Sequence, residues 1–135
     1  MRGSRGRERG SATIEFALAL PILMMIVFGA VEFGLSLHRQ QVITDAAREG
    51  ARYGIVMSTP RPSGSEIMSV VNNYLSTAGW DANAASVTVT GAGGASGNDL
   101  TVRVDYPSSM AMLSKLVPGV PASITLRSVT VMKLE

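Results

Sequence analysis

Side chains that could carry out chemistry are few in this sequence and far apart. Its 135 residues include one histidine, His38, and no cysteine, which excludes cysteine nucleophiles, thiolate metal sites and disulfides. One histidine is too few for a typical zinc site, and Asp81, Asp99 and Asp105 lack the spacing of a calcium-binding loop. No serine lies in a G-x-S-x-G pattern. We therefore expect a protein that is not an enzyme and that holds no cofactor or metal.

The longest apolar stretch of the chain runs from residue 16 to residue 37. It contains a single ionisable side chain, Glu32, and as a helix it would span about 33 Å, enough to cross the core of a bilayer. The stretch is longer than the apolar region of a secretory signal peptide, and no clear A-x-A cleavage site follows it. We expect residues 16–37 to form one transmembrane helix.

The charges before this stretch predict its orientation. Residues 1–10 contain four of the twelve basic residues and one of the ten acidic residues: Arg2, Arg5, Arg7, Arg9 and Glu8. A short basic flank of this kind is retained in the cytoplasm, so the chain after residue 37 is expected outside. The rest of the chain has eight basic and nine acidic residues. Nucleic-acid binding is therefore not expected, because the basic character belongs to the leader.

Two stretches at the N-terminus resemble known sequences. Residues 10–16 (GSATIEF) resemble the processing site of type IV-type prepilins, in which a prepilin peptidase cuts after the glycine on the cytoplasmic face. The longer string GSATIEFALALPILMMIVFGAVEFGLSL, followed by QQVITDAAREGARYG, resembles the TadE-like family, small pseudopilins of the tight-adherence (Flp) pilus machinery. The resemblance extends over about residues 10–54. It rests on the Gly10-to-Glu15 spacing, Pro21, the Glu32-Phe33-Gly34 exit and the alanine-rich run that follows.

The resemblance implies processing, location and partners. Cleavage would fall between Gly10 and Ser11, and the protein would be a single-pass protein of the bacterial inner membrane. Its partners would be a prepilin peptidase, other pilins or pseudopilins of the same system, an inner-membrane assembly platform and the lipid bilayer. Glu15, Phe16 and Glu32 are the candidate residues for contacts between subunits.

Two carboxylates in or near the apolar stretch allow alternative interpretations. Cleavage would give Ser11 an α-amine, which the Glu15 carboxylate of a neighbouring subunit could pair with, since an unpaired membrane carboxylate is costly. Alternatively, Glu15 only marks the cytoplasmic boundary. Glu32 lies about 8 Å from the outer end of the stretch by helical rise, so it could either reach the interface or pair with another subunit.

The helix is expected to continue from residue 38 to residue 57, because no proline interrupts this part of the chain. Small apolar residues recur there at helical spacing and form a stripe that permits close approach of another element. The stripe could pack on this chain's own exported domain or on another subunit. Its members are Ala46, Ala47, Gly50, Ala51 and Gly54, flanked by Val42 and Ile43.

The remaining sequence predicts a small α+β domain. A capping box at Ser63 and Glu66 starts a helix over residues 64–77, which Gly79 ends. Alternating patterns predict strands at residues 86–90, 100–106 and 123–133, with Pro107 ending the second strand and a bulge near Arg127 in the third. A short helix is expected at residues 108–116, and Trp80 is expected to plug the core.

These elements predict an α+β, pilin-like fold in which a long N-terminal helix packs on a small antiparallel sheet. The expected divisions are a cleaved leader (1–10), the long helix (11–57) and an exported domain (58–135). The expected function is that of a minor pilin-like subunit needed to assemble a tight-adherence pilus. Two alternatives are a membrane-anchored binding or assembly module that never enters a filament, and a pseudopilin of a secretion or DNA-uptake system.

Overall fold

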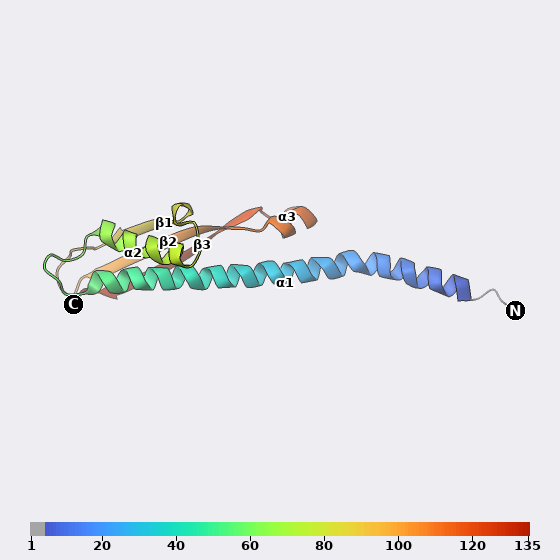
Figure 1. The fold of residues 1–135 in the computed structure, drawn as a ribbon, viewed down its shortest axis with the longest axis horizontal. Helices are drawn as coiled ribbons and strands as arrows, with labels where there is room; N and C mark the ends of the chain where they lie inside the picture. The colour runs from blue at the N-terminus through green and yellow to red at the C-terminus, as the bar shows by residue number, and fades with distance from the viewer. Residues whose placement is uncertain (1–4) are drawn as a thin grey trace. The chain divides into compact units, whose positions relative to one another are not determined.

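The computed structural model describes residues 5–135, so residues 1–4 of the predicted leader lie outside the described part. The helices are α1 (Arg5–Ile55), α2 (Gly64–Thr77) and α3 (Ala111–Leu116), with a short 3-10 turn at Ala82–Ala84. The strands are β1 (Ser86–Thr90), β2 (Asp99–Ser109) and β3 (Ser123–Lys133). Figure 1 shows one long helix, a small sheet and further helices, which confirms the predicted α+β class.

The chain forms two compact units. The first unit comprises the N-terminal part of the chain through Leu35 together with Met110–Ala122. The second unit comprises Ser36–Ser109 together with Ser123–Glu135. The predicted exported domain, residues 58–135, therefore contributes to both units, because the segment between β2 and β3 groups with the N-terminal part of α1.

The helix α1 runs through Pro21 without interruption and ends at Ile55, two residues before the predicted end. Within the described residues it is the one helix long and apolar enough to cross a membrane. Its apolar part is long enough for a span, as predicted, since about 20 apolar residues are needed.

The helix α2 has the bounds predicted from its caps. The Ser63 backbone N–H donates to a Glu66 carboxylate oxygen at 2.7 Å, and the Glu66 N–H donates to the Ser63 hydroxyl at 3.3 Å. At the other end Gly79 has a φ of 81°, and the backbone N–H groups of Gly79 and Trp80 donate to the carbonyls of Ser76 and Leu75. This is a Schellman arrangement, which satisfies the last carbonyls of the helix.

The three strands form an antiparallel sheet in the order β1-β2-β3. The bounds of β1 and β3 are those predicted, but β2 is longer than predicted and contains Pro107. The predicted end of the strand at Pro107 is therefore wrong. β1 pairs with β2 only as far as Asp105, so Pro107 lies where β2 has a free edge, and a proline is tolerated there. The short helix accordingly begins at Ala111 and not at residue 108.

The predicted bulge in β3 is also wrong. Its pairing with β2 is continuous from Ser123 opposite Ser109 to Lys133 opposite Asp99. The inward face consequently carries Ser128, which is 6% exposed, while Val129 and Val131 are 52% and 56% exposed on the other face. The two valines suggested a change of phase in the sequence, but an unbroken ladder keeps the alternation of period two.

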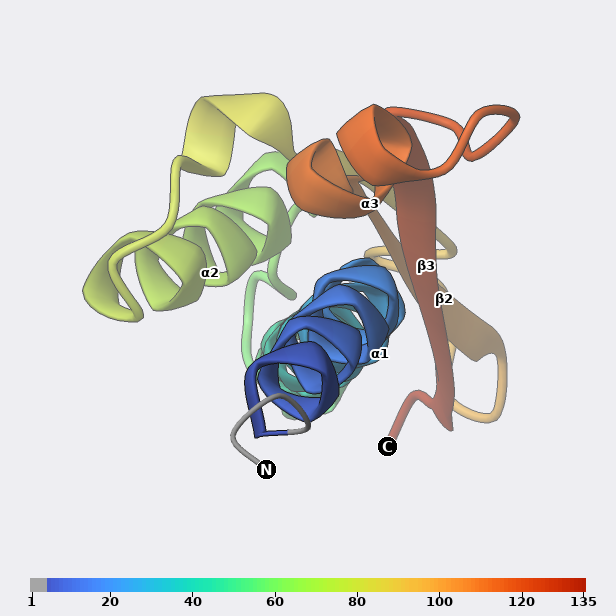
Figure 2. The same cartoon turned by 90° about the vertical axis from the view of Figure 1, so that its right-hand side faces the viewer.

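The core of the second unit lies between two helices and one face of the sheet. The C-terminal part of α1, α2 and the sheet lie side by side in both ribbon views (Figures 1 and 2). The fully buried side chains come from α1, α2 and β2: Ile43, Ala46, Ala47, Ala51, Ile67, Val71, Leu75, Leu100, Val102 and Val104. The apolar face predicted for β2 is the face that packs on the helices.

Candidate functional site

The predicted processing site lies on an exposed part of α1. All residues from 10 to 19 are exposed, and a Cβ added to Gly10 would meet nothing within 4 Å. The Ser11 hydroxyl donates to a Glu15 carboxylate oxygen at 3.3 Å, because residues four apart lie on the same side of a helix. Ser11 and Glu15 are thus close enough to interact, and Phe16, which is 63% exposed, follows them.

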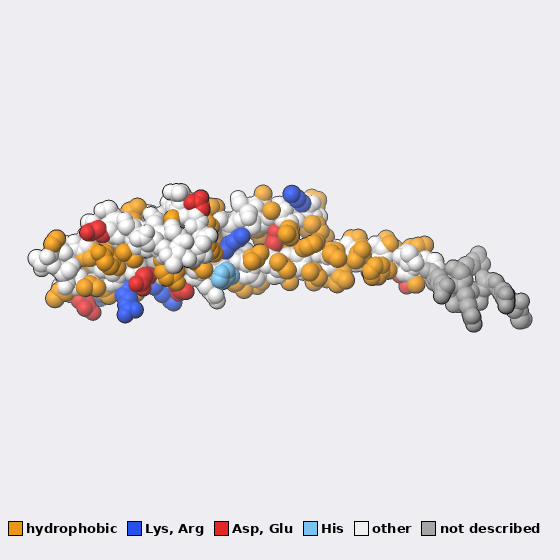
Figure 3. Space-filling model, in the orientation of Figure 1, with side chains coloured by type: hydrophobic (Ala, Val, Ile, Leu, Met, Phe, Trp, Pro, Cys, Tyr) orange, Lys and Arg blue, Asp and Glu red, His pale blue; other side chains and the backbone are white. Residues whose placement is uncertain are grey.

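The following part of α1 presents large apolar side chains to its surroundings. Leu18, Ile26 and Phe33 are 70%, 65% and 65% exposed. Figure 3 shows hydrophobic side chains along this part of the helix, with few charged ones among them. A water-soluble monomer rarely exposes so many neighbouring large apolar side chains.

Glu32 does not lie on this exposed surface. It is 7% exposed, and its two carboxylate oxygens accept hydrogen bonds from the backbone N–H groups of Met112 (2.6 Å) and Leu113 (3.1 Å). These are donors of the first turn of α3, for which the N-cap residue Met110 offers no side-chain acceptor. Glu32 therefore caps α3 from within the same chain, because its carboxylate accepts from N–H groups that a helix start leaves unsatisfied.

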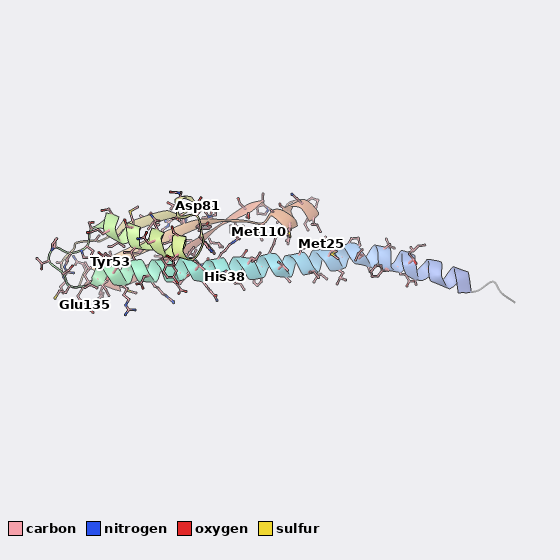
Figure 4. The ribbon with its side chains drawn as sticks, in the orientation of Figure 1. Met25, His38, Tyr53, Asp81, Met110 and Glu135 are labelled. Carbon is pink, nitrogen blue, oxygen red and sulfur yellow. The ribbon has the colours of Figure 1, made fainter. Side chains whose placement is uncertain are left out.

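The sequence could not indicate this partner. Met112 and Leu113 are 80 and 81 residues from Glu32, and apolar side chains carry no sign that their backbone N–H groups need an acceptor. The one local signal was that the N-cap residue, Met110, has no side-chain oxygen to accept from these N–H groups. Figure 4 labels Met110 at the start of this segment.

The stripe of small residues in α1 is buried inside the second unit. Ala46, Ala47 and Ala51 are fully buried. A Cβ added to Gly50 would lie 2.4 Å from a methyl group of Val71, and one added to Gly54 would lie 2.5 Å from a methyl group of Leu100. The small residues thus allow α1 to approach α2 and β2 closely.

Three polar residues just after the apolar stretch contact the rest of the second unit, and the sequence analysis did not predict these contacts. The Arg39 guanidinium donates to the buried Ser108 hydroxyl at 2.7 Å, and the Gln40 amide donates to the Arg127 carbonyl at 2.9 Å. The His38 ring, labelled in Figure 4, makes an edge contact with Trp80. Trp80 packs against the core as predicted and lies 4.9 Å from Tyr106 between ring centroids.

Three charged residues of the second unit, Asp105, Arg103 and Arg127, form a cluster on the sheet. Asp105 accepts hydrogen bonds from Arg127 at 2.6 Å and from Arg103 at 2.8 Å. The hydrogen bonds from Arg127 and then from Arg103 lower the pKa of Asp105 below its ordinary value of 3.8. The Asp105 carboxylate thus has one arginine partner on each of its two oxygens.

No group of three or more potential metal-ligating side chains occurs among residues that the structure describes. The N-terminal part of α1 therefore holds two candidate features: the exposed Gly10–Phe16 segment and the buried Glu32 that caps α3.

A long apolar helix joined to a small antiparallel sheet defines a class of α+β proteins suited to anchoring in a membrane. Residues 10–52 match the model of a protein family described as TadE-like protein, which confirms the predicted resemblance. The match suggests involvement in a tight-adherence (Flp) pilus system, and the family is one of pilus structural proteins, not of enzymes. No curated protein and no solved structure matches the chain.

Proposed function

We propose that this protein is a minor pilin-like subunit, a pseudopilin, needed to assemble a tight-adherence pilus. The match of residues 10–52 to TadE-like proteins carries the proposal. The exposed apolar surface of α1 supports anchoring in a membrane, which we propose to be the bacterial inner membrane. The basic leader supports a cytoplasmic N-terminus, with residues 58–135 exported.

A prepilin peptidase is the proposed processing enzyme. It would cut between Gly10 and Ser11, where the open surroundings of Gly10 leave room for an enzyme. Mass spectrometry of the protein from its native membrane should find Ser11 at the N-terminus. An intact Met1 start would contradict this proposal, and so would a start after residue 37.

The proposed role of Glu15 is to pair with the Ser11 α-amine of a neighbouring pilin or pseudopilin. Its carboxylate is exposed and accepts a hydrogen bond from the Ser11 hydroxyl at 3.3 Å, so a charged group of a neighbouring subunit could reach it. Leaving one member of a buried charge pair without the other costs about 3–5 kcal/mol. Loss of the Glu15 carboxylate should therefore impair assembly, while insertion persists because the helix becomes more apolar.

The test compares Glu15→Ala with Glu49→Ala, a change at an exposed glutamate of the same helix. Both variants are expressed at wild-type level, and their membrane insertion and cleavage are confirmed. Crosslinking to other pilins and surface piliation should fall for Glu15→Ala and stay normal for Glu49→Ala. Normal crosslinking and piliation of both variants would reduce Glu15 to a boundary marker.

A second candidate is a membrane-anchored assembly factor that does not enter the filament. It is favoured by the burial of Ala46, Ala47 and Ala51 within the chain, because this stripe is then not available to another subunit. Detection of the processed chain in purified, sheared pili would exclude this candidate. Its retention in the membrane fraction of cells with normal pili would favour it.

A further inference from the structure

The segment between β2 and β3 is more apolar than its position in a domain outside the membrane requires. Met110–Ala122, which reads MAMLSKLVPGVPA, contains one charged side chain, Lys115. Met112 and Leu116 are 51% and 39% exposed. An exposed apolar segment of this kind marks a surface that contacts something other than water.

This segment packs on the apolar part of α1 in the first unit. Glu32 caps α3 through two hydrogen bonds, and a Cβ added to Gly29 would lie 3.7 Å from a methyl group of Leu113. Phe28, Gly29 and Glu32 are less exposed than most of their neighbours in α1. Phe28 and Gly29 lie four and three residues before Glu32, so the three positions are on one side of the helix.

The contact positions fix the level of the segment along α1. If residues 16–37 span the membrane, Glu32 and Gly29 lie about 8 Å and about 12 Å inside the outer end of the span, by the helical rise of 1.5 Å per residue. An element held at this level lies just below the headgroups, among the outer ends of the acyl chains, close to the depth of about 5–10 Å at which amphipathic helices bury their apolar faces.

The backbone of the segment is suited to such an environment. The N–H groups of Met110, Ser114 and Val117 donate to carbonyls within the segment. The first turn of α3, which would otherwise expose free N–H groups, donates to Glu32. Unsatisfied backbone groups are costly in lipid, so the Glu32 carboxylate lowers the cost of placing α3 near acyl chains. Lys115 is long enough to reach the headgroups.

We propose that Met110–Ala122 is a second membrane-contacting segment of this protein, positioned by Glu32. It lies in the bilayer interface on the side away from the cytoplasm, with Met112 and Leu116 against lipid. Both α1 and α3 expose apolar side chains within the first unit, and α3 is held at the level of the proposed span, so lipid is the partner that covers both. This inference rests on the proposed membrane span of residues 16–37.

The absence of native cysteine permits a direct test with single-cysteine variants of the full chain. Met112→Cys and Leu116→Cys are labelled with an environment-sensitive fluorophore and reconstituted into vesicles of phosphatidylcholine and phosphatidylglycerol that contain spin-labelled quencher lipids. Val129→Cys is the matched control, since Val129 is as exposed as Met112 (52% and 51%) but lies on the sheet. Val27→Cys, in the apolar part of α1, reports the span itself.

Quenching and a blue shift at positions 27, 112 and 116, but not at 129, are the expected results. Quenching at 27 with none at 112 and 116 would overturn this inference alone, including the case in which another subunit covers the segment. Lack of quenching at 27 would overturn the membrane span and, with it, the inference.

The role of Glu32 is tested by adding Glu32→Ala to the Met112→Cys protein. Quenching at Met112 should decrease, because α3 loses the acceptor that holds it on α1. Glu49→Ala, at an exposed glutamate of the same helix, is the matched control and should leave the quenching unchanged. Fluorescence of Trp80, the only tryptophan, shows whether the second unit stays folded. Unchanged quenching in Glu32→Ala would overturn the positioning role.

Discussion

The two parts of α1 use apolar residues in opposite ways. Its N-terminal part carries large side chains such as Ile26, which is 65% exposed, while its C-terminal part carries small residues around Ile43, which is fully buried. In the first part most of the large side chains are exposed and do not pack on the rest of the chain. In the second part the small residues let α2 and β2 approach closely enough to bury Ile43.

Residue size, and not apolar character alone, therefore distinguishes the two environments of α1. Large side chains cover the helix where lipid is the proposed neighbour, since lipid adapts to any shape. Alanine and glycine occur where another rigid element must fit, because a close-packed interior has no room for added volume. Matched substitutions in the two parts of α1 test this contrast.

The largest effect is expected from shortening isoleucine in the buried part. Ile43→Ala should lower the free energy of unfolding by about 2–5 kcal/mol, since it leaves a cavity among packed side chains. Thermal unfolding of the detergent-solubilised full chain, followed by Trp80 fluorescence, measures this. Ile26→Ala, the same change in the exposed part, should shift it little. Equal losses of stability in the two variants would contradict the difference in packing between the two parts of α1.

Two glycines of α1 give a second test of the contrast between its two parts. Gly50→Ala should destabilise the second unit by about 1–3 kcal/mol, because its Cβ would meet Val71 at 2.4 Å and overpack the core. Gly34→Ala adds a Cβ that meets nothing within 4 Å, and alanine favours a helix over glycine. The Gly34 variant should therefore be at least as stable as the wild type. A stable Gly50→Ala protein would show that α1 and α2 separate readily.

The cap of α2 should matter less than the core it supports. Ser63→Ala removes the hydroxyl that accepts from the Glu66 N–H, and a lost N-cap typically costs about 1 kcal/mol. The melting temperature of the full chain measures this loss, and Ser63→Asp should restore most of it. A Ser63→Ala protein as stable as the wild type would mean that the core alone holds α2 in place.

The smallest effect is expected from the exposed charges of the sheet. Arg127 and Arg103 lower the pKa of Asp105 in the folded state, so their contribution to stability is complete above the ordinary value of 3.8. It is lost as the pH falls through the lower, folded-state pKa. Melting temperatures measured between about pH 6 and about pH 2 should fall less steeply for Asp105→Asn than for the wild type.

Local signals were sufficient for the elements whose ends depend on nearby residues. Ser63, Glu66 and Gly79 predict both ends of α2 because their hydrogen bonds join residues within a few positions of each other. The alternation in β1, the bounds of β3 and the length of the apolar stretch are likewise properties of short windows of sequence. The Gly10-to-Glu15 spacing and the residues that follow were enough to indicate the TadE-like resemblance.

Other features depend on residues that are distant in the sequence. The inward face of β3, the continuation of β2 through Pro107 and the burial of the small-residue stripe all follow from pairing or packing between elements. Glu32 is the clearest case: its environment depends on backbone N–H groups 80 and 81 residues away. A carboxylate in an apolar helix predicts that some donor must satisfy it, but only the packing of Met110–Ala122 on α1 identifies which donors do so.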